Sequence, residues 1–280
     1  MELPKILHLY WEERPMSYLQ TLTVETFHRK NPGWEIQVHI PLQKENSPAK
    51  YIPDYVGVDY FPEIRKLKYV NIIYEDLKKY GIDEKLHNIL RSDILRYHLL
   101  YNVGGVWSDF DVLWLKSMEY LDKIPVVGSV RVSDMGFSVC QFHGTSGFHS
   151  IGVMMAKAGN PFFQNLITLC NRIQNQARWK HKLAHQVFGP TLLTRIFPNL
   201  ETLEKQYKDV VGFPYKTFYP YSIFSLDLLY KQKDMSYVDE EVMAVHWFNG
   251  HSLSKAYIHN GYKEDCSMTV LLNLIKKGLL

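Results

Sequence analysis

The residues best suited to chemistry are two aspartates, Asp109 and Asp111, separated by Phe110. Carboxylate oxygens are preferred ligands of Mg²⁺ and Mn²⁺, which commonly complete their coordination with water and substrate phosphates. Side chains alternate along an extended chain, so two acids in this spacing at a strand end are expected to project to one side. The tripeptide also occurs in solvated turns, and its interpretation therefore depends on the residues around it.

The segment before the aspartates is predicted to be an amphipathic helix that carries an acid and a guanidinium. Apolar residues recur at steps of three and four from Leu86 to Tyr101, with Asp83 as the expected N-cap. Asp93 and Arg96 are three residues apart and therefore share one face of this helix. Such a pair is also common as an ordinary surface ion pair, worth a few tenths of a kcal/mol.

A glycine pair separates this helix from the aspartates. Gly104 and Gly105 permit the left-handed conformation that caps a helix C-terminus, and a strand from Val106 to Leu115 is predicted to follow. The order of helix, glycine turn, strand and carboxylates places Asp93 and Arg96 beside a site for a metal and a diphosphate. The planar guanidinium group matches the geometry of phosphate oxygens.

The order of elements in the first half of the chain predicts a parallel, nucleotide-binding sheet, because strands alternate with helices. Ligands of such sheets bind beyond the carboxyl ends of the strands. The second half is expected to be mixed. The predicted strands are residues 4–11, 34–40, 69–74, 126–131, 137–142, 210–219 and 242–248, and the further helices are 15–30, 161–178, 181–197 and 268–280.

Residues at the two ends of the chain are further candidates for contact with a nucleotide. Tyr10 or Trp11, at the end of the first predicted strand, can stack on the base, with core packing as the alternative. His246 lies at a predicted strand end and can supply another metal ligand or touch the diphosphate, and Ser252 after it is a further candidate for the nucleotide site. The alternative for this histidine is a satisfied core residue. Imidazole together with carboxylates suits Mn²⁺ somewhat better than Mg²⁺.

The string from Ser92 to Asp111, S-D-I-L-R-Y-x-x-L-Y-x-x-G-G-V-W-x-D-x-D, resembles the signature of glycosyltransferase family 32. This family of D-x-D sugar transferases includes initiating α-mannosyltransferases and α-1,4-galactosyltransferases, and the glucosylating domains of clostridial toxins carry a related string. Three further segments are similar to family segments. They are Leu3–Trp11 (P-K-I-I-H-x-x-W in the family), Phe188–Thr191 (G-P-x-x-L-T) and Ala244–Trp247 with Ser252 (A-x-H-x-x-x-x-S-W).

The chain departs from the family pattern at two positions. The family often has an Asn ahead of a K-P-G-H-P-like segment, and no matching Asn stands near Ile151. Leu253 stands where the family has a Trp after the serine. His185, Gln186 and the segment Phe188–Thr191 are expected to line the acceptor side of the site.

The resemblance implies an α/β, GT-A type nucleotide-sugar-binding fold with a mixed, mostly parallel central sheet flanked by helices. It implies transfer of a hexose or N-acetylhexosamine from a UDP- or GDP-linked sugar to a glycan or other hydroxyl acceptor, with retention of anomeric configuration. Asp93 and Arg96 would hold sugar hydroxyls and the diphosphate. Asp111 would bind the metal directly, and Asp109 would bind the ribose, or the metal through water. The resemblance also favours Trp11 as the stacking residue.

Two other functions remain open at this point. The first is a phosphohydrolase of the haloacid dehalogenase type, whose nucleophile lies in a D-x-D motif. That motif normally follows a strand near the chain start and continues with Gly-Thr or a similar pair, whereas Val112 and Leu113 follow here. The second is a catalytically inactive sugar-nucleotide-binding module, against which the intact acids and Arg96 argue.

Length and composition set further expectations. The 280 residues fit one domain, with a nucleotide-binding half at about 1–115 and an acceptor-side and helical part at about 116–280. The net charge of +3 gives no electrostatic reason to expect a nucleic-acid partner. Three scattered cysteines, without a signal peptide or an anchor in this sequence, favour a cytoplasmic, bacterial or viral type of enzyme. The apolar helix 268–280 is expected to pack on the body, with peripheral membrane contact as the alternative.

Overall fold

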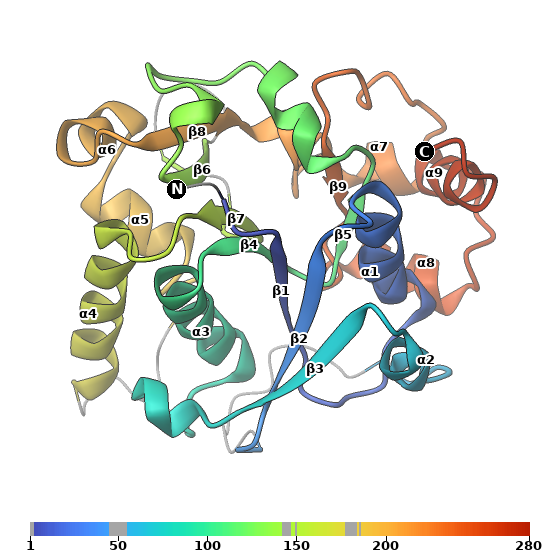
Figure 1. The fold of residues 1–280 in the computed structure, drawn as a ribbon. Helices are drawn as coiled ribbons and strands as arrows, with labels where there is room; N and C mark the ends of the chain where they lie inside the picture. The colour runs from blue at the N-terminus through green and yellow to red at the C-terminus, as the bar shows by residue number, and fades with distance from the viewer. Residues whose placement is uncertain (1–2, 45–54, 142–146, 149, 177–183, 185) are drawn as a thin grey trace.

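A seven-stranded sheet in the order β3-β2-β1-β4-β7-β6-β8 forms the centre of the protein (Figure 1). The structure, a computed structural model, describes residues 3–44, 55–141, 147–148, 150–176, 184 and 186–280. The strands are β1 (Ile6–Tyr10), β2 (Glu35–Pro41), β3 (Val70–Glu75), β4 (Gly105–Ser108), β5 (Val112–Trp114), β6 (Phe137–Gln141), β7 (Val153–Ala156), β8 (Val210–Pro214) and β9 (Ala244–His246).

The strand pairing confirms the predicted α/β class with a mixed, mostly parallel central sheet. Strands β1, β2, β3 and β4 are mutually parallel, as are β6 and β8, whereas β7 runs antiparallel to both β4 and β6. Strands β5 and β9 form a separate antiparallel pair. The central sheet therefore combines strands from both halves of the chain.

Helices cover both faces of this sheet (Figure 1). The helices are α1 (Tyr18–Lys30), α2 (Phe61–Lys66), α3 (Asn88–Asn102), α4 (Pro161–Asn175), α5 (Pro190–Ile196), α6 (Leu200–Gln206), α7 (Leu226–Tyr230), α8 (Ser252–His259) and α9 (Ser267–Lys276). Short 3-10 helices are η1 (Leu77–Tyr80), η2 (Met118–Lys123), η3 (Val132–Asp134) and η5 (Tyr215–Thr217).

The side chains of each strand point alternately to the two faces of the sheet, and the buried ones therefore belong to two hydrophobic clusters. Trp107 of β4 packs with residues of α3 and α4, whereas its neighbour Val106 packs with residues of α1. Successive side chains of a strand point to opposite faces, so one short buried strand serves both clusters. A third cluster joins α7, α8 and α9 to the β5–β9 pair and to α1.

The C-terminal helix α9 packs on the body, as expected. Its apolar residues Met268, Leu271 and Ile275 are buried in the third cluster, together with Leu19 of α1. Arg29 of α1 also donates a hydrogen bond to the carbonyl oxygen of Ile275, at 2.6 Å. None of the helices in the described ranges has the length and apolar character needed to cross a bilayer.

The predicted start of the helix before the aspartates is wrong. Helix α3 begins at Asn88, and the ring of His87, not Asp83, caps it by accepting a hydrogen bond from the Ile89 amide at 3.3 Å. Asp83 instead accepts from the Lys85 amide within a preceding turn. Leu86 is buried in that turn, which is why the apolar spacing extended past the true helix end.

Several predicted strands and helices also have different limits. The continuous strand predicted from Val106 to Leu115 is two strands, β4 and β5, in two different sheets. Strand β7 escaped prediction because its residues are buried on both faces and show no polar alternation. Residues 126–131 form only an isolated bridge at Val127, and the helix expected at 181–197 is present, within the described residues, as α5.

Candidate functional site

A cleft of about 1240 Å³ opens at the carboxyl ends of β1 and β4. Strands β2 and β3 follow β1 on one side, and β4 lies on the other, so the direction of strand order changes between β1 and β4. Open α/β sheets bind ligands at such a switch point. Seven of the residues predicted for the site line this cleft: Tyr10, Trp11, Asp93, Arg96, Asp109, Asp111 and His246. Ser252 is exposed in the first turn of α8 and is not among the lining residues.

The two aspartates lie in a turn between β4 and β5, not at the end of a continuous strand. The Asp109 amide donates to the Gly152 carbonyl at 2.8 Å, and the Asp111 carbonyl accepts from the Trp247 amide at 2.8 Å. Phe110 between them is only 6% exposed and packs edge-on against Trp11, with ring centroids 5.2 Å apart. The buried Phe110 side chain therefore anchors the turn, and the turn brings the carboxylates together.

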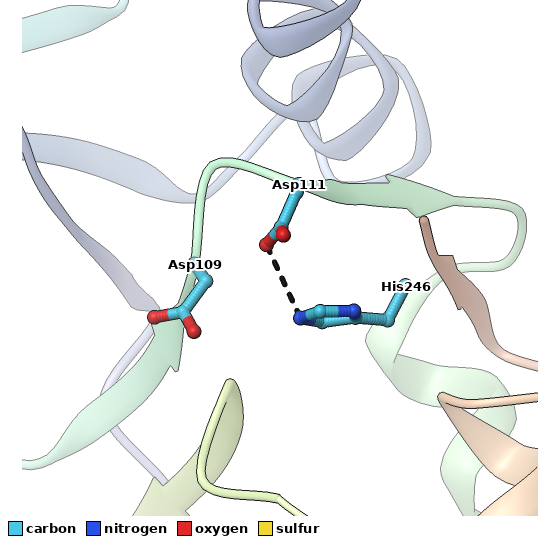
Figure 2. Close-up of side chains that lie close together, drawn as sticks. All are labelled: Asp109, Asp111 and His246. Carbon is cyan, nitrogen blue, oxygen red and sulfur yellow. Dashed lines mark ion pairs between the residues drawn. The ribbon is translucent and has the colours of Figure 1, made fainter. Parts of the chain in front are cut away.

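Asp109, Asp111 and His246 form a group of possible metal ligands, drawn as sticks in Figure 2. One ligand atom from each lies within 4.8 Å of the other two. Val112 pairs with His246 in the β5–β9 ladder, which places the imidazole beside Asp111, with Nε2 at 3.2 Å from Oδ1. The other Asp111 oxygen accepts a hydrogen bond from the Asn249 amide at 2.8 Å.

Gly152 leaves open the space between two of these ligands. A Cβ atom added at this glycine would lie 3.0 Å from Oδ2 of Asp109 and 3.1 Å from Nε2 of His246. The observed positions of the Asp109 carboxylate and the His246 imidazole therefore depend on the absence of a side chain at position 152. The sequence alone did not reveal this role, since the glycine precedes a strand that was not predicted.

Arg96 lies between two carboxylates. Its Nη2 is 2.8 Å from Asp93 Oδ1 and 3.3 Å from Asp109 Oδ1, and only 4% of its side chain is exposed. The guanidinium also lies over the Trp107 ring, 4.7 Å from the centroid, and donates to the carbonyl of Ile151. Trp107 Nε1 in turn donates to Asp109 Oδ1 at 2.9 Å. These contacts fix the guanidinium and one oxygen of Asp109.

Burial and neighbouring charges shift the pKa values of these groups. Burial raises the pKa of Asp93 to about 7, although the Arg96 charge opposes this effect. Burial also raises the pKa of Asp109, again against Arg96. At Asp111 burial acts in the same direction, but the charge and hydrogen bond of His246 outweigh it and lower the pKa. Burial would lower the pKa of His246, yet the Asp111 carboxylate raises it.

Trp11 and Tyr10 lie where the prediction put them, at the end of β1. Trp11 Nε1 donates to the carbonyl of Arg14 at 3.0 Å, and the half-buried ring contacts the cleft. The Tyr10 hydroxyl donates to Glu12 Oε1 at 2.7 Å. Glu12 and Arg14 also line the cleft, although no pattern in the sequence distinguishes them from other surface charges.

The residues expected on the acceptor side are only partly described. His185 lies outside the described residues, whereas Gln186, Pro190 and Thr191 line the cleft. In the segment that lacks the family's Asn, Ser150 lines the cleft and accepts a hydrogen bond from the Gly152 amide at 3.1 Å.

Comparison with known proteins agrees with this site. Residues 19–128 match a family sequence model described as a glycosyltransferase sugar-binding region containing a DXD motif. No curated protein sequence matches the chain.

Solved structures of glycosyltransferases align with the chain at low identity. PaToxG glycosyltransferase is 18% identical over 74% of each chain, with a TM-score of 0.46. The glycosyltransferase GlyE of Streptococcus pneumoniae TIGR4 is 11% identical over 99% of this chain and 64% of its own, with a TM-score of 0.47. The galactosyltransferase LgtC, in complex with donor and acceptor sugar analogues, is 11% identical over 91% of this chain and 95% of its own, with a TM-score of 0.42.

The family match covers the elements that position Asp109 and Asp111. It includes the whole of α3 with Asp93 and Arg96, the strand β4 and both aspartates of the turn. His246 lies outside the matched region and joins the site through the β5–β9 pairing. Residues 19–128 are therefore similar to the sugar-binding region of glycosyltransferases that contains a DXD motif.

Proposed function

We propose that the protein is a metal-dependent, retaining glycosyltransferase that moves a hexose or N-acetylhexosamine from a UDP- or GDP-linked sugar to a hydroxyl of a glycan or other acceptor. The observation that supports this most directly is the grouping of Asp109, Asp111 and His246 beside the buried Arg96, at the switch point of the sheet. A diphosphate with its cation fits such a combination of carboxylates, imidazole and guanidinium.

The residues present suit Mn²⁺, with Mg²⁺ as the alternative. Two carboxylates and an imidazole are a donor set that Mn²⁺ accepts more readily than Mg²⁺ does. Asp111 is the ligand expected to contact the ion directly, because Oδ1 of Asp109 is engaged by Arg96 and Trp107. When bound, the ion supplies positive charge that stabilises the departing diphosphate. His246 would then bind as the neutral imidazole.

Arg96 supplies a positive charge from the protein, in addition to that of the metal ion. Asp93, Asp109 and the Trp107 ring hold the guanidinium in place before any substrate binds. A charge already oriented toward the leaving group costs no reorganisation when negative charge develops there. Asp93, on the same helix face, is the residue expected to accept hydrogen bonds from sugar hydroxyls.

At the other end of the cleft, Trp11 is the residue expected to stack on the base, and Asp109 to reach the ribose. Retention of configuration fits front-face attack by the acceptor hydroxyl, whose proton passes to the departing phosphate oxygen. This route uses no dedicated protein base. The three unpaired, buried cysteines suit action in the reducing cytoplasm.

The test is a screen of donor hydrolysis and transfer across common UDP- and GDP-sugars, with Mn²⁺ or Mg²⁺ and with chelator. We expect turnover of one donor class that requires the ion, with product retention assigned by NMR. Asp111→Asn should lower kcat by at least about 100-fold, since it removes a ligand and the charge that orients His246. Asp134→Asn is the matched control, because Asp134 pairs only with Arg131 in the described structure and lies outside the cleft.

Two outcomes would contradict the proposal. Metal-independent turnover, or full activity in the Asp111 variant, would show that the assignment of the metal site is wrong. Hydrolysis of simple phosphate monoesters without any preference for a nucleotide sugar would favour the phosphohydrolase.

A further inference from the structure

Arg91 is a buried cation that does not belong to the cleft lining. It lies on α3, the helix that carries Asp93 and Arg96, and its side chain is 0% exposed. Burying a guanidinium is costly unless charges or hydrogen bonds compensate it. Neither the family motif nor the proposed chemistry uses this residue, so its partners must explain why the fold keeps it.

The guanidinium of Arg91 connects the ends of two strands. One nitrogen, Nη1, lies 3.6 Å from Oε1 of Glu12, two residues past the end of β1. The other, Nη2, donates to the carbonyl of Gln43, two residues past the end of β2. The Gln43 side chain continues the connection, since it accepts from the Leu77 amide at 2.9 Å, in the helix that follows β3.

Glu12 is the member of this network that reaches the cleft. Its Oε1 accepts from the Tyr10 hydroxyl at 2.7 Å, and its Oε2 lies 3.0 Å from Nη2 of Arg14. Tyr10, Glu12 and Arg14 all line the cleft beside Trp11. The Glu12 carboxylate therefore contacts both the side chains of this cleft wall and the buried Arg91 guanidinium.

We infer that Arg91 is a positioning residue for the nucleotide end of the donor, acting through Glu12. The inference rests on the proposed function, which places the nucleotide at the end of β1. Only a forked side chain can hold the Gln43 carbonyl and the Glu12 carboxylate at the same time. Arg91 thus sets donor affinity, whereas the metal ligands and Arg96 set the rate of transfer.

The test compares Arg91→Met and Arg91→Lys with the wild type by steady-state kinetics and by calorimetry with the nucleoside diphosphate and Mn²⁺. We expect KM for the donor and Kd for the nucleotide to rise about tenfold in Arg91→Met, with kcat changed less than about twofold. Arg91→Lys should recover only part of the affinity. Arg29→Met is the control, because Arg29 also donates to a backbone carbonyl but lies away from the cleft.

A double-variant cycle separates positioning from general stability. If Arg91 acts through Glu12, Arg91→Met combined with Glu12→Gln should weaken nucleotide binding no more than the worse single change does. Additive losses, or an unchanged nucleotide Kd in a folded Arg91→Met protein, would overturn the inference. The same results would leave the proposed function intact, because that fails only if the wild type turns over no nucleotide sugar.

Discussion

At the scale of single residues, Gly152 sets the space around Asp109 and His246, two of the proposed metal ligands. A methyl group there would lie about 3 Å from both Asp109 and His246, closer than ordinary side-chain contacts. We expect Gly152→Ala to displace one of these ligands and to weaken Mn²⁺ binding at least about tenfold, with little change in thermal stability. Calorimetric titration with Mn²⁺ measures this directly.

The control for that variant is Gly33→Ala, since a Cβ at Gly33 meets no heavy atom within 4 Å. An unchanged Mn²⁺ affinity in Gly152→Ala would show that the ion does not lie between Asp109 and His246. A loss of folding would be visible as a lowered Tm, which the Gly33 control is not expected to show.

At the scale of elements, the turn between β4 and β5 shows what the sequence could and could not predict. The aspartates, the glycines before them and Arg96 were identified because their spacing is local to one helix and one turn. The predicted way in which the two carboxylates come together was wrong. A continuous strand was expected, whereas the chain crosses from one sheet to another at this turn. His246 was placed only at a strand end, since its contact with Asp111 depends on a pairing 134 residues apart between β5 and β9.

The anchor of that turn gives a prediction for the whole element. Phe110 is 6% exposed and packs against Trp11. Phe110→Ala should therefore cost about 3 kcal/mol of unfolding free energy and also weaken Mn²⁺ binding, because both ligands flank the lost side chain. Phe197→Ala, 5% exposed in the other cluster, should cost similar stability but leave Mn²⁺ affinity unchanged. Urea unfolding and Mn²⁺ titration of both variants distinguish anchoring from general packing; equal Mn²⁺ affinity in the two would exclude an anchoring role.

At the scale of the whole molecule, a chain of hydrogen bonds crosses the parallel strands, and those of His8 are buried. His8 Nε2 lies 2.8 Å from the Gly104 carbonyl, His8 Nδ1 lies 3.0 Å from His39 Nε2, and His39 Nδ1 lies 2.7 Å from Glu75. His8 donates to the Gly104 carbonyl through Nε2 and accepts from His39 at Nδ1, which is the pattern of a neutral imidazole with one donor and one acceptor nitrogen.

This arrangement predicts a loss of stability in mild acid. Burial, with the neighbouring His39 charge, lowers the pKa of His8 to about 4, from 6.5 in the unfolded chain. Between these values the unfolded state binds the proton more tightly, so the stability that neutral His8 contributes is complete above pH 6.5 and falls as the pH approaches 4. The slope from one such histidine is at most about 1.4 kcal/mol per pH unit.

The measurement is urea unfolding of the wild type and His8→Gln at pH 7 and pH 5. Gln can donate to the Gly104 carbonyl without taking up a proton, so the difference in unfolding free energy between the two pH values should be smaller in the variant. Asp93 changes the unfolding free energy in the opposite direction. Its pKa is raised in the folded protein, so proton uptake by Asp93 stabilises the fold as the pH falls through 7. Both proteins share Asp93, so subtracting one pH dependence from the other isolates His8. Equal pH dependence in the two proteins would mean that His8 is protonated as readily in the fold as in the unfolded chain.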